Sequence, residues 1–253
     1  MKLTILGSGT CVPSLRRSSC SFVIETDDKE LLFDIGAGTI RRLLEADIAI
    51  NKITHIFLSH LHPDHTGELI SFLFSSKYPK LLRNNNPLTI IAGKGFKKFF
   101  AGLRNVYGNW IEFDPGLLSI VEMDTSCEDQ LSINGLVIRT IPVKHTEESI
   151  AYRIEKNGKS ITYSGDTDTC DSLITLAEGT DIFICESAMP DDLKVDNHLS
   201  PSSAGIIAKK AGVKKMILTH FYPECDKTDI AKECRRTYDG ELVLAEDLMT
   251  LLI

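Results

Sequence analysis

Short apolar runs alternate along the chain with segments whose apolar residues recur at helical spacing. Near the amino terminus KLTILG, CSFVIET and ELLFDI have the length and β-branched content of buried strands, separated by breaks such as DDKE. The segments that follow are GTIRRLLEADI with helical spacing, ITHIFLS with strand character, and GELISFLFSS with helical spacing again. This exchange of strand and helix predicts an α/β fold.

The same alternation continues to the carboxyl terminus. RNNNP is a predicted loop, LTIIAG a strand, and KGFKKFFAGLRNVYG an amphipathic helix with Lys97, Lys98 and Arg104 on its polar face. LLSIVEM, LVIRTIPV, SIAYRIE and SITYS are predicted strands, with NGK as a hairpin turn. The last third alternates between predicted helices in DSLITLAEG, SPSSAGIIAKKAG and KTDIAKECRRTY and predicted strands in DIFICE, KKMILTH and GELVLAED. No linker interrupts the series, so we expect one domain over residues 1–253.

Composition narrows the class of protein. Hydrophobic residues make up 43% and charged residues 25% of the chain, which excludes disordered and collagen-like classes. The net charge of -7 excludes a strongly basic nucleic-acid footprint. The 7 cysteines are odd in number and form no CxxC, so we expect reduced thiols. The chain has no transmembrane-length apolar run, and the run in MKLTILGSGT is too short for a secretory signal, so we expect a cytoplasmic protein without membrane partners.

The strongest chemical signal is the cluster SHLHPDH directly after a predicted strand. It contains four side chains able to bind a metal: His60, His62, Asp64 and His65. At the extended start of the loop His60 and His62 point the same way, because side chains repeat with a period of two. The turn at Pro63 then lets Asp64 and His65 point to a neighbouring position. The cluster therefore predicts ligands for two metals rather than one.

Other candidate ligands also follow predicted strands. His145 comes after LVIRTIPV, Asp166 after SITYS, and His220 ends KKMILTH. Strand ends at one edge of a sheet are where α/β folds gather ligands, so we expect these side chains to come together. His55 lies inside a predicted strand instead, and we interpret it as a core residue.

Four features together resemble the metallo-β-lactamase superfamily: SHLHPDH, the lone His145, SGDT and LTH. Three further segments resemble the ribonuclease Z branch of this superfamily: GSGTCVPS, LLFDIGAGT and NHLSPSSAGIIAKKAGVKKMILTH. The resemblance implies a four-layer αββα sandwich, a single metallo-hydrolase domain over residues 1–253, and a dinuclear metal site at one edge of the two sheets. The implied ligands are His60, His62 and His145 for one metal, Asp64, His65 and His220 for the other, and Asp166 as the bridge.

The residue types indicate the chemistry of such a site. Imidazole and carboxylate ligands suit zinc, and also manganese or iron. Asp166 stands where most true β-lactamases of the superfamily carry Cys, which disfavours β-lactam hydrolysis. Two divalent cations, two aspartates and a bridging hydroxide leave a net positive charge, which favours an anionic phosphodiester substrate. The hydroxide is the expected nucleophile, because metal binding lowers the pKa of water to about 7.

A leaving alkoxide needs a proton, and His198 in DNHLSPSS is the candidate general acid. The ribonuclease Z resemblance places a histidine here, supported by an acidic residue at a strand end, which is Glu186 in this chain. The expected catalytic residues are therefore Asp64, His198 and Glu186. The alternative is that His198 caps a turn and Glu186 is a surface acid.

Two features depart from the ribonuclease Z branch. The segment HTEESIAYRIEKNGKSITYSGD, from His145 to Asp166, holds one predicted hairpin and lacks the long Gly/Pro-rich arm that grips tRNA. Ala37 in GAGT replaces an acidic residue that is frequent there. We therefore expect a metal-dependent phosphodiesterase resembling ribonuclease Z, acting on RNA or a small nucleotide. The resemblance also allows a homodimer.

Two alternatives to this function stay open. One is a hydrolase of small esters, thioesters or cyclic nucleotides on the same dinuclear site. The other belongs to a different class, a non-catalytic metal-binding module that recruits a partner. The complete set of candidate ligands argues against the second alternative.

Overall fold

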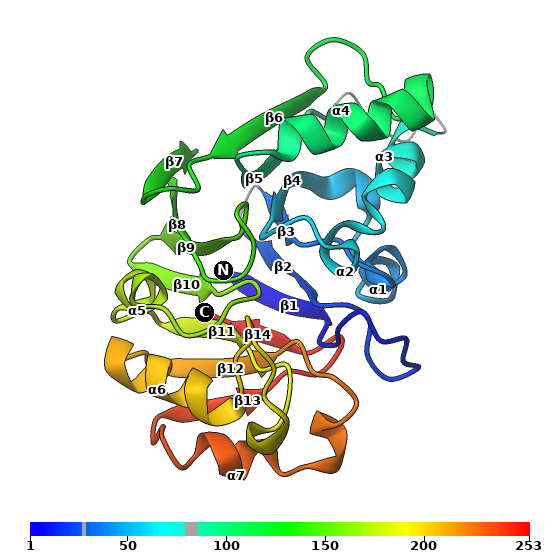
Figure 1. Cartoon of the computed structure of the whole chain (residues 1–253). Helices are drawn as coiled ribbons and strands as arrows, with labels where there is room; N and C mark the ends of the chain where they lie inside the picture. Colours follow the sequence, from blue (N-terminus) through cyan, green and yellow to red (C-terminus); the bar gives the residue numbers. More distant parts are fainter. Residues whose placement is uncertain (27–28, 79–85) are drawn as a thin grey trace. The chain divides into compact units, whose positions relative to one another are not determined.

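The computed structural model describes residues 1–26, 29–78 and 86–253 (Figure 1). The predicted DDKE break and RNNNP loop lie partly outside the described residues. The chain divides into two compact units, of which the first comprises Met1–Glu122 with Glu246–Ile253 and the second Met123–Ala245. Each unit contains a seven-stranded sheet with its own helices. The expectation of a single domain stays a prediction.

The sheet of the first unit mixes antiparallel and parallel strands. Its order is β14 (Thr250–Leu252), β1 (Lys2–Gly7), β2 (Ser21–Glu25), β3 (Glu30–Phe33), β4 (Ile53–Leu58), β5 (Leu88–Gly93) and β6 (Leu118–Met123). β1, β2 and β3 pair antiparallel, whereas β3, β4 and β5 run parallel. Parallel neighbours need a crossover, and helices supply it between β3 and β4 and between β4 and β5.

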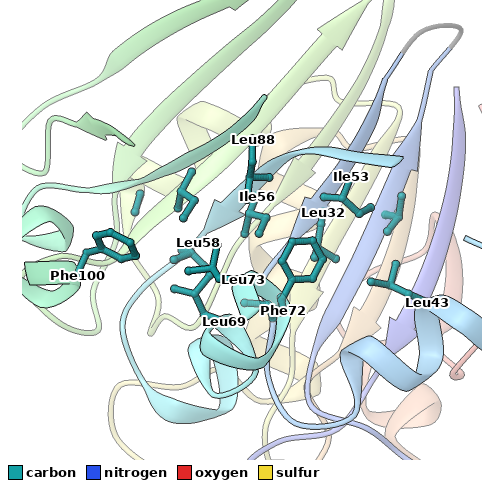
Figure 2. Close-up of a cluster of buried hydrophobic side chains, with 14 of the residues drawn as sticks. Leu32, Leu43, Ile53, Ile56, Leu58, Leu69, Phe72, Leu73, Leu88 and Phe100 are labelled. Atoms are coloured by element: carbon teal, nitrogen blue, oxygen red, sulfur yellow. The ribbon is translucent and has the colours of Figure 1, made fainter. Parts of the chain in front are cut away.

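Within its described residues, the first unit has the helices α1 (Thr39–Glu45), α2 (Pro63–Thr66), α3 (Leu69–Lys77) and α4 (Phe96–Tyr107), with short 3-10 turns at Ile50–Lys52 and Gly108–Trp110. Figure 2 shows Leu69, Phe72 and Leu73 of α3 facing Ile56 and Leu58 of β4. These side chains are fully or almost fully buried. Burial of each contributes about 1.5–3 kcal/mol, so this core fixes the strand that leads to SHLHPDH.

The amphipathic pattern of α4 is confirmed. Phe96 and Phe100 are buried in the core of the first unit, while Lys97 and Lys98 are exposed. His55 is also buried as predicted, at 9% exposure, with its Nδ1 2.8 Å from the Thr54 hydroxyl. Burial, reinforced by the charge of Lys29, lowers the pKa of His55 to about 4, so this imidazole is neutral at physiological pH.

The sheet of the second unit has the order β13 (Glu241–Leu244), β12 (Lys215–Thr219), β11 (Ile182–Glu186), β10 (Lys159–Tyr163), β9 (Ile150–Lys156), β8 (Leu136–Pro142) and β7 (Asp129–Ile133). β7 to β10 pair antiparallel; two-residue turns join β7 to β8 and β9 to β10, and the longer segment 143–149 joins β8 to β9. Asn157 and Gly158 of the predicted NGK turn have φ of 52° and 73°, the left-handed conformations that two-residue hairpins require.

The parallel half of this sheet, β10 to β13, alternates with helices. These are α5 (Asp171–Ala177), α6 (Pro201–Ala211) and α7 (Ile230–Cys234), with 3-10 turns at Asp191–Leu193 and Cys225–Lys227. The predicted cap of α6 is present: Ser200 and Ser203 form a capping box, and Gly212 ends the helix at φ 62°. α7 is shorter than its sequence pattern predicts, and β7, β14 and the single turn α2 are additional to the predicted elements.

The described residues include all seven cysteines, and no disulfide bond joins any of them. Among the described residues, no helix has the length and apolar character to cross a membrane.

Candidate metal centre

The first unit gathers the histidines of SHLHPDH around one point. β4 delivers His60, and α2 then begins at Pro63, whose fixed φ suits the first position of a helix. The helical turn brings His65 back, so the ring centroids of His60 and His65 lie 4.1 Å apart. The ring of His62 lies 4.7 Å from that of His60, and an oxygen of Asp64 lies 3.8 Å from His65 Nε2. All four predicted residues therefore meet within this unit.

Two residues outside the predicted set orient these imidazoles. Asp34 is fully buried and lies 2.8 Å through Oδ2 from His65 Nδ1. The Ser59 hydroxyl donates to the same Asp34 carboxylate at 2.8 Å, and its oxygen lies 3.0 Å from His60 Nδ1. Because that hydroxyl proton is already given to Asp34, His60 Nδ1 is the donor to Ser59. The Nε2 lone pairs of His60 and His65 are thus the ones available to a metal, the usual arrangement for metal-binding histidines.

The LLFDIGAGT segment packs closely against α2. The Ile35 amide donates to the His65 carbonyl at 2.8 Å, and the Glu68 amide donates to the Ile35 carbonyl at 2.9 Å. A Cβ at Gly36 would lie 1.7 Å from the Asp64 carbonyl oxygen, a distance no side chain tolerates. Glycine at this position therefore allows the loop that carries Asp34 to approach the histidine helix.

The second unit gathers its candidate residues mostly from strand ends, as the sequence predicts for His145, Asp166 and His220. His145 follows β8, Asp166 follows β10, Glu186 ends β11, His198 precedes α6 and His220 follows β12. Asp166 Oδ2 lies 3.3 Å from His220 Nε2 and 4.0 Å from His198 Nδ1. The His198 ring lies 4.9 Å from the ring of His145 and 5.6 Å from that of His220. The five side chains form one cluster.

Oxygen acceptors again orient the imidazoles. The Asn197 carbonyl accepts from His145 Nδ1 at 3.0 Å, and Glu186 Oε1 lies 2.9 Å from His198 Nδ1. The Glu186 carboxylate also accepts from the amides of Thr167 at 2.8 Å and Ala188 at 3.2 Å. Burial raises the pKa of Glu186, and the hydrogen bond from His198 opposes that rise. Glu186 is 1% exposed, so it is not the surface acid of the alternative interpretation.

The donor set of both clusters fits divalent metal ions. Imidazole nitrogen and carboxylate oxygen suit zinc, manganese and iron. In the second unit the potential ligand atoms of His145, Asp166 and His198 lie within 4.8 Å of one another, and so do those of Glu186, His198 and His220. The roles of the individual residues, as ligands or as acid, stay predictions.

Sequence reasoning missed Asp34, Ser59 and the Asn197 carbonyl. A signal existed for Asp34, which follows a buried strand just as the candidate ligands do and has a left-handed φ of 54°. Ser59 is adjacent to His60 but carries no pattern of its own. A backbone carbonyl is common to every residue, so the role of Asn197 leaves no mark in the sequence.

Comparison with known proteins identifies the family. The family model of the anti-Pycsar protein Apyc1 matches residues 1–238. The chain belongs to this family. The uncharacterized protein Rv1339 of Mycobacterium tuberculosis is 31% identical over 245 residues, covering 95% of this chain and 88% of its own. Ribonuclease Z of Methanothermobacter thermautotrophicus is 28% identical over 298 aligned positions, covering 99% of this chain and 96% of its own.

The fold of this Apyc1 family member is shared with a solved structure. The metallo-β-lactamase fold protein YhfI from Bacillus subtilis superposes with a TM-score of 0.85 at 22% identity, covering 99% of both chains. The predicted metallo-β-lactamase fold and the resemblance to the ribonuclease Z-like branch are therefore confirmed.

Proposed function

We propose that the protein is a metal-dependent phosphodiesterase with two divalent ions. His60, His62 and His145 would hold one ion, Asp64, His65 and His220 the other, and Asp166 would bridge them. This assignment draws on both units and follows the family resemblance. The contacts of Asp34 with His65 and of Asn197 with His145 support it, because each leaves Nε2 to face a metal. Zinc is the proposed metal, and the proposed location is the cytoplasm, which the odd number of cysteines and the lack of a CxxC pattern support.

The pairing of His198 with Glu186 carries the proposal. Glu186 is held by two backbone amides and fixes Nδ1 of His198, so the opposite ring nitrogen is left to act on a substrate. A buried carboxylate beside an imidazole favours its protonated form, which can donate a proton to a departing alkoxide. An alkoxide is the leaving group of a nucleotide phosphodiester. The divalent ions, when bound, supply Lewis acidity and a more acidic water.

The substrate we propose is a small phosphodiester, cyclic nucleotides included, rather than precursor tRNA. The interval from His145 to Asp166 is filled by the hairpin of β9 and β10, which leaves no residues for a long arm. The alignment with the archaeal ribonuclease Z spans 298 positions, more than the 253 residues of this chain, so that relative carries insertions that this chain lacks. The alignment with Rv1339, by contrast, spans 245 residues, which is fewer than the 253 residues of this chain.

Reporter substrates of different reaction classes test the proposed function. Purified protein is stripped of metal, reloaded separately with Zn²⁺ or Mn²⁺, and assayed on bis-p-nitrophenyl phosphate, p-nitrophenyl acetate and 3′,5′-cyclic nucleotides. We expect metal-dependent turnover of the diesters, with the acetate ester hydrolysed far more slowly. Turnover of the ester alone would favour the small-ester alternative, and metal binding without any turnover would favour the non-catalytic module.

A further inference from the structure

Residues 190–200, which lie between β11 and α6, carry one histidine of the second unit and contact another; this segment is named the His198 loop here. It carries His198, whose Nδ1 lies 2.9 Å from Glu186 Oε1. One residue earlier, the Asn197 carbonyl accepts a hydrogen bond from His145 Nδ1 at 3.0 Å. Asn197 has a φ of 64°, a left-handed conformation that asparagine tolerates better than most residues. The position of this one loop therefore sets the orientation of both imidazoles.

Both ends of the His198 loop are anchored to the body of the unit. The Asp191 carboxylate accepts from the Ser202 amide at 3.0 Å, and the Asp191 amide donates to Glu233 Oε2 at 3.0 Å. At the other end the Leu199 carbonyl accepts from the Ala188 amide at 3.1 Å. Residues 194–197, which include the carbonyl that orients His145, lie between these two anchors.

An ion pair holds this middle part of the loop. Lys194 Nζ lies 3.1 Å from Asp168 Oδ1, with the Asp168 side chain 14% exposed. Asp168 is itself fixed, because its amide donates to the Lys144 carbonyl at 2.9 Å and its Oδ1 accepts from the Thr169 amide at 2.7 Å. It also stands two residues after Asp166. The ion pair thus joins the His198 loop to the segment that carries the proposed bridging carboxylate.

We propose that Asp168 and Lys194 are positioning residues: their ion pair holds the His198 loop where Asn197 orients His145 and His198 faces the substrate. The inference rests on the proposed function and adds to it. Neither residue touches the reacting atoms, so the pair acts through the two imidazoles. An ion pair at a fully exposed position contributes little, but this one has a largely buried carboxylate and holds a segment with two functional contacts.

Lys144 provides a matched control. It lies 3.8 Å from the other oxygen of Asp168, and its side chain is 62% exposed. Lys144→Met removes the same charge beside the same carboxylate as Lys194→Met, but leaves the His198 loop attached. Lys194→Arg keeps the ion pair and serves as the conservative variant.

The first readout is independent of activity. In metal-free protein labelled with ¹⁵N-histidine, nuclear magnetic resonance reports the Nδ1 protons that His145 and His198 donate to their oxygen acceptors. We expect Lys194→Met to weaken or lose the exchange-protected signals of both, while Lys144→Met and Lys194→Arg retain them. Unchanged signals in Lys194→Met would overturn the proposal.

The second readout is the kinetics of small-diester hydrolysis by the metal-loaded enzyme. We expect Lys194→Met to lower kcat about 10-fold with KM within about twofold, Lys144→Met to stay within about twofold of wild type, and Lys194→Arg to recover most of the loss. A raised KM at unchanged kcat would mean that Lys194 binds substrate, and equal losses in both methionine variants would mean a general charge effect; either overturns the proposal. If wild type hydrolyses no diester, the proposed function fails, and the resonance comparison still decides whether the pair holds the loop.

Discussion

Two histidines in each unit have one ring nitrogen fixed by an oxygen. His60 is held by Ser59, His65 by Asp34, His145 by the Asn197 carbonyl and His198 by Glu186. In each case Nδ1 is engaged, so Nε2 is the nitrogen that faces a metal or a substrate. The same ring nitrogen is engaged in all four, which is the arrangement that the proposed metal-binding and acid roles require.

Replacement of His198 tests its role as an acid rather than a ligand. His198→Ala should retain both metals but slow hydrolysis of a diester with an alkoxide leaving group by about 10²–10⁴-fold. The loss should be smaller with p-nitrophenolate, which departs without protonation. His55→Gln is the control, because it removes a histidine outside the site. Loss of metal, or equal losses on both substrates, would show that His198 is not the general acid.

Asp34→Asn tests whether the buried carboxylate tunes the metal site. An amide at this position can present N–H to His65 Nδ1 and favour the wrong tautomer. We expect metal affinity to fall about 10- to 100-fold, measured by competition with a chelator. Asp47→Asn is the matched control, since Asp47 is an exposed aspartate that also has a left-handed φ, here 58°. Equal metal affinities of Asp34→Asn and wild type would show that Asp34 does not tune the metal site.

At the level of elements, the short helix α2 depends on close approach of the loop before α1. Gly36→Ala would place a Cβ 1.7 Å from the Asp64 carbonyl, so the loop or the helix must shift. We expect a loss of about 1–3 kcal/mol in unfolding free energy, together with weaker metal binding. The unfolding free energy is measured by chemical denaturation.

Gly102→Ala is the matched glycine control. Gly102 lies in α4 with nothing within 4 Å of an added Cβ. This substitution should stabilise the protein by about 0.5–1 kcal/mol, because alanine favours the helix. Equal effects of the two substitutions would contradict the packing argument at Gly36.

The elements that sequence patterns predicted are those with strong apolar signals. β4 and β12 are buried runs that could be recognised, and the Ser200 cap and Gly212 end of α6 were visible in SPSSAGIIAKKAG. α2 has four residues, too few for any helical periodicity to show. β7 alternates half-buried and exposed residues in a short polar segment, so its pattern is weak. α7 ends at Cys234, although the helical spacing of the sequence continues beyond that residue. The chain forms a turn there instead of a longer helix.

For the whole molecule, the strand-end rule accounts for how much of the site the sequence could predict. His60 follows a buried strand of the first unit, and Asp166 and His220 follow buried strands of the second, so the strand order of each unit places its own candidate residues. No such rule covers the contacts that orient His60, His65 and His145, because they depend on the Ser59 hydroxyl, on Asp34 at a positive φ and on the Asn197 carbonyl. Such contacts are set by tertiary packing and leave no periodic signal.

The whole-molecule charge and the short hairpin predict weak binding of large RNA. The net charge of -7 offers few phosphate contacts, which normally supply most non-specific affinity for nucleic acid. We expect measurable turnover of small phosphodiesters but weak, salt-sensitive cleavage of precursor tRNA. Side-by-side kinetics at two salt concentrations give the comparison. Efficient tRNA 3′ trimming by the purified protein at physiological salt would show that the missing arm does not limit the substrate.

Metal stoichiometry measured together with diesterase activity tests the central claim most directly. Elemental analysis of the metal-loaded wild type should give two divalent ions per chain, with bis-p-nitrophenyl phosphate hydrolysis rising as they bind and vanishing on chelation. Asp166→Ala should lose most of the metal and nearly all activity, because both ions are proposed to share that carboxylate. One ion or none in fully folded wild type, or activity that survives complete chelation, would contradict a two-metal phosphodiesterase.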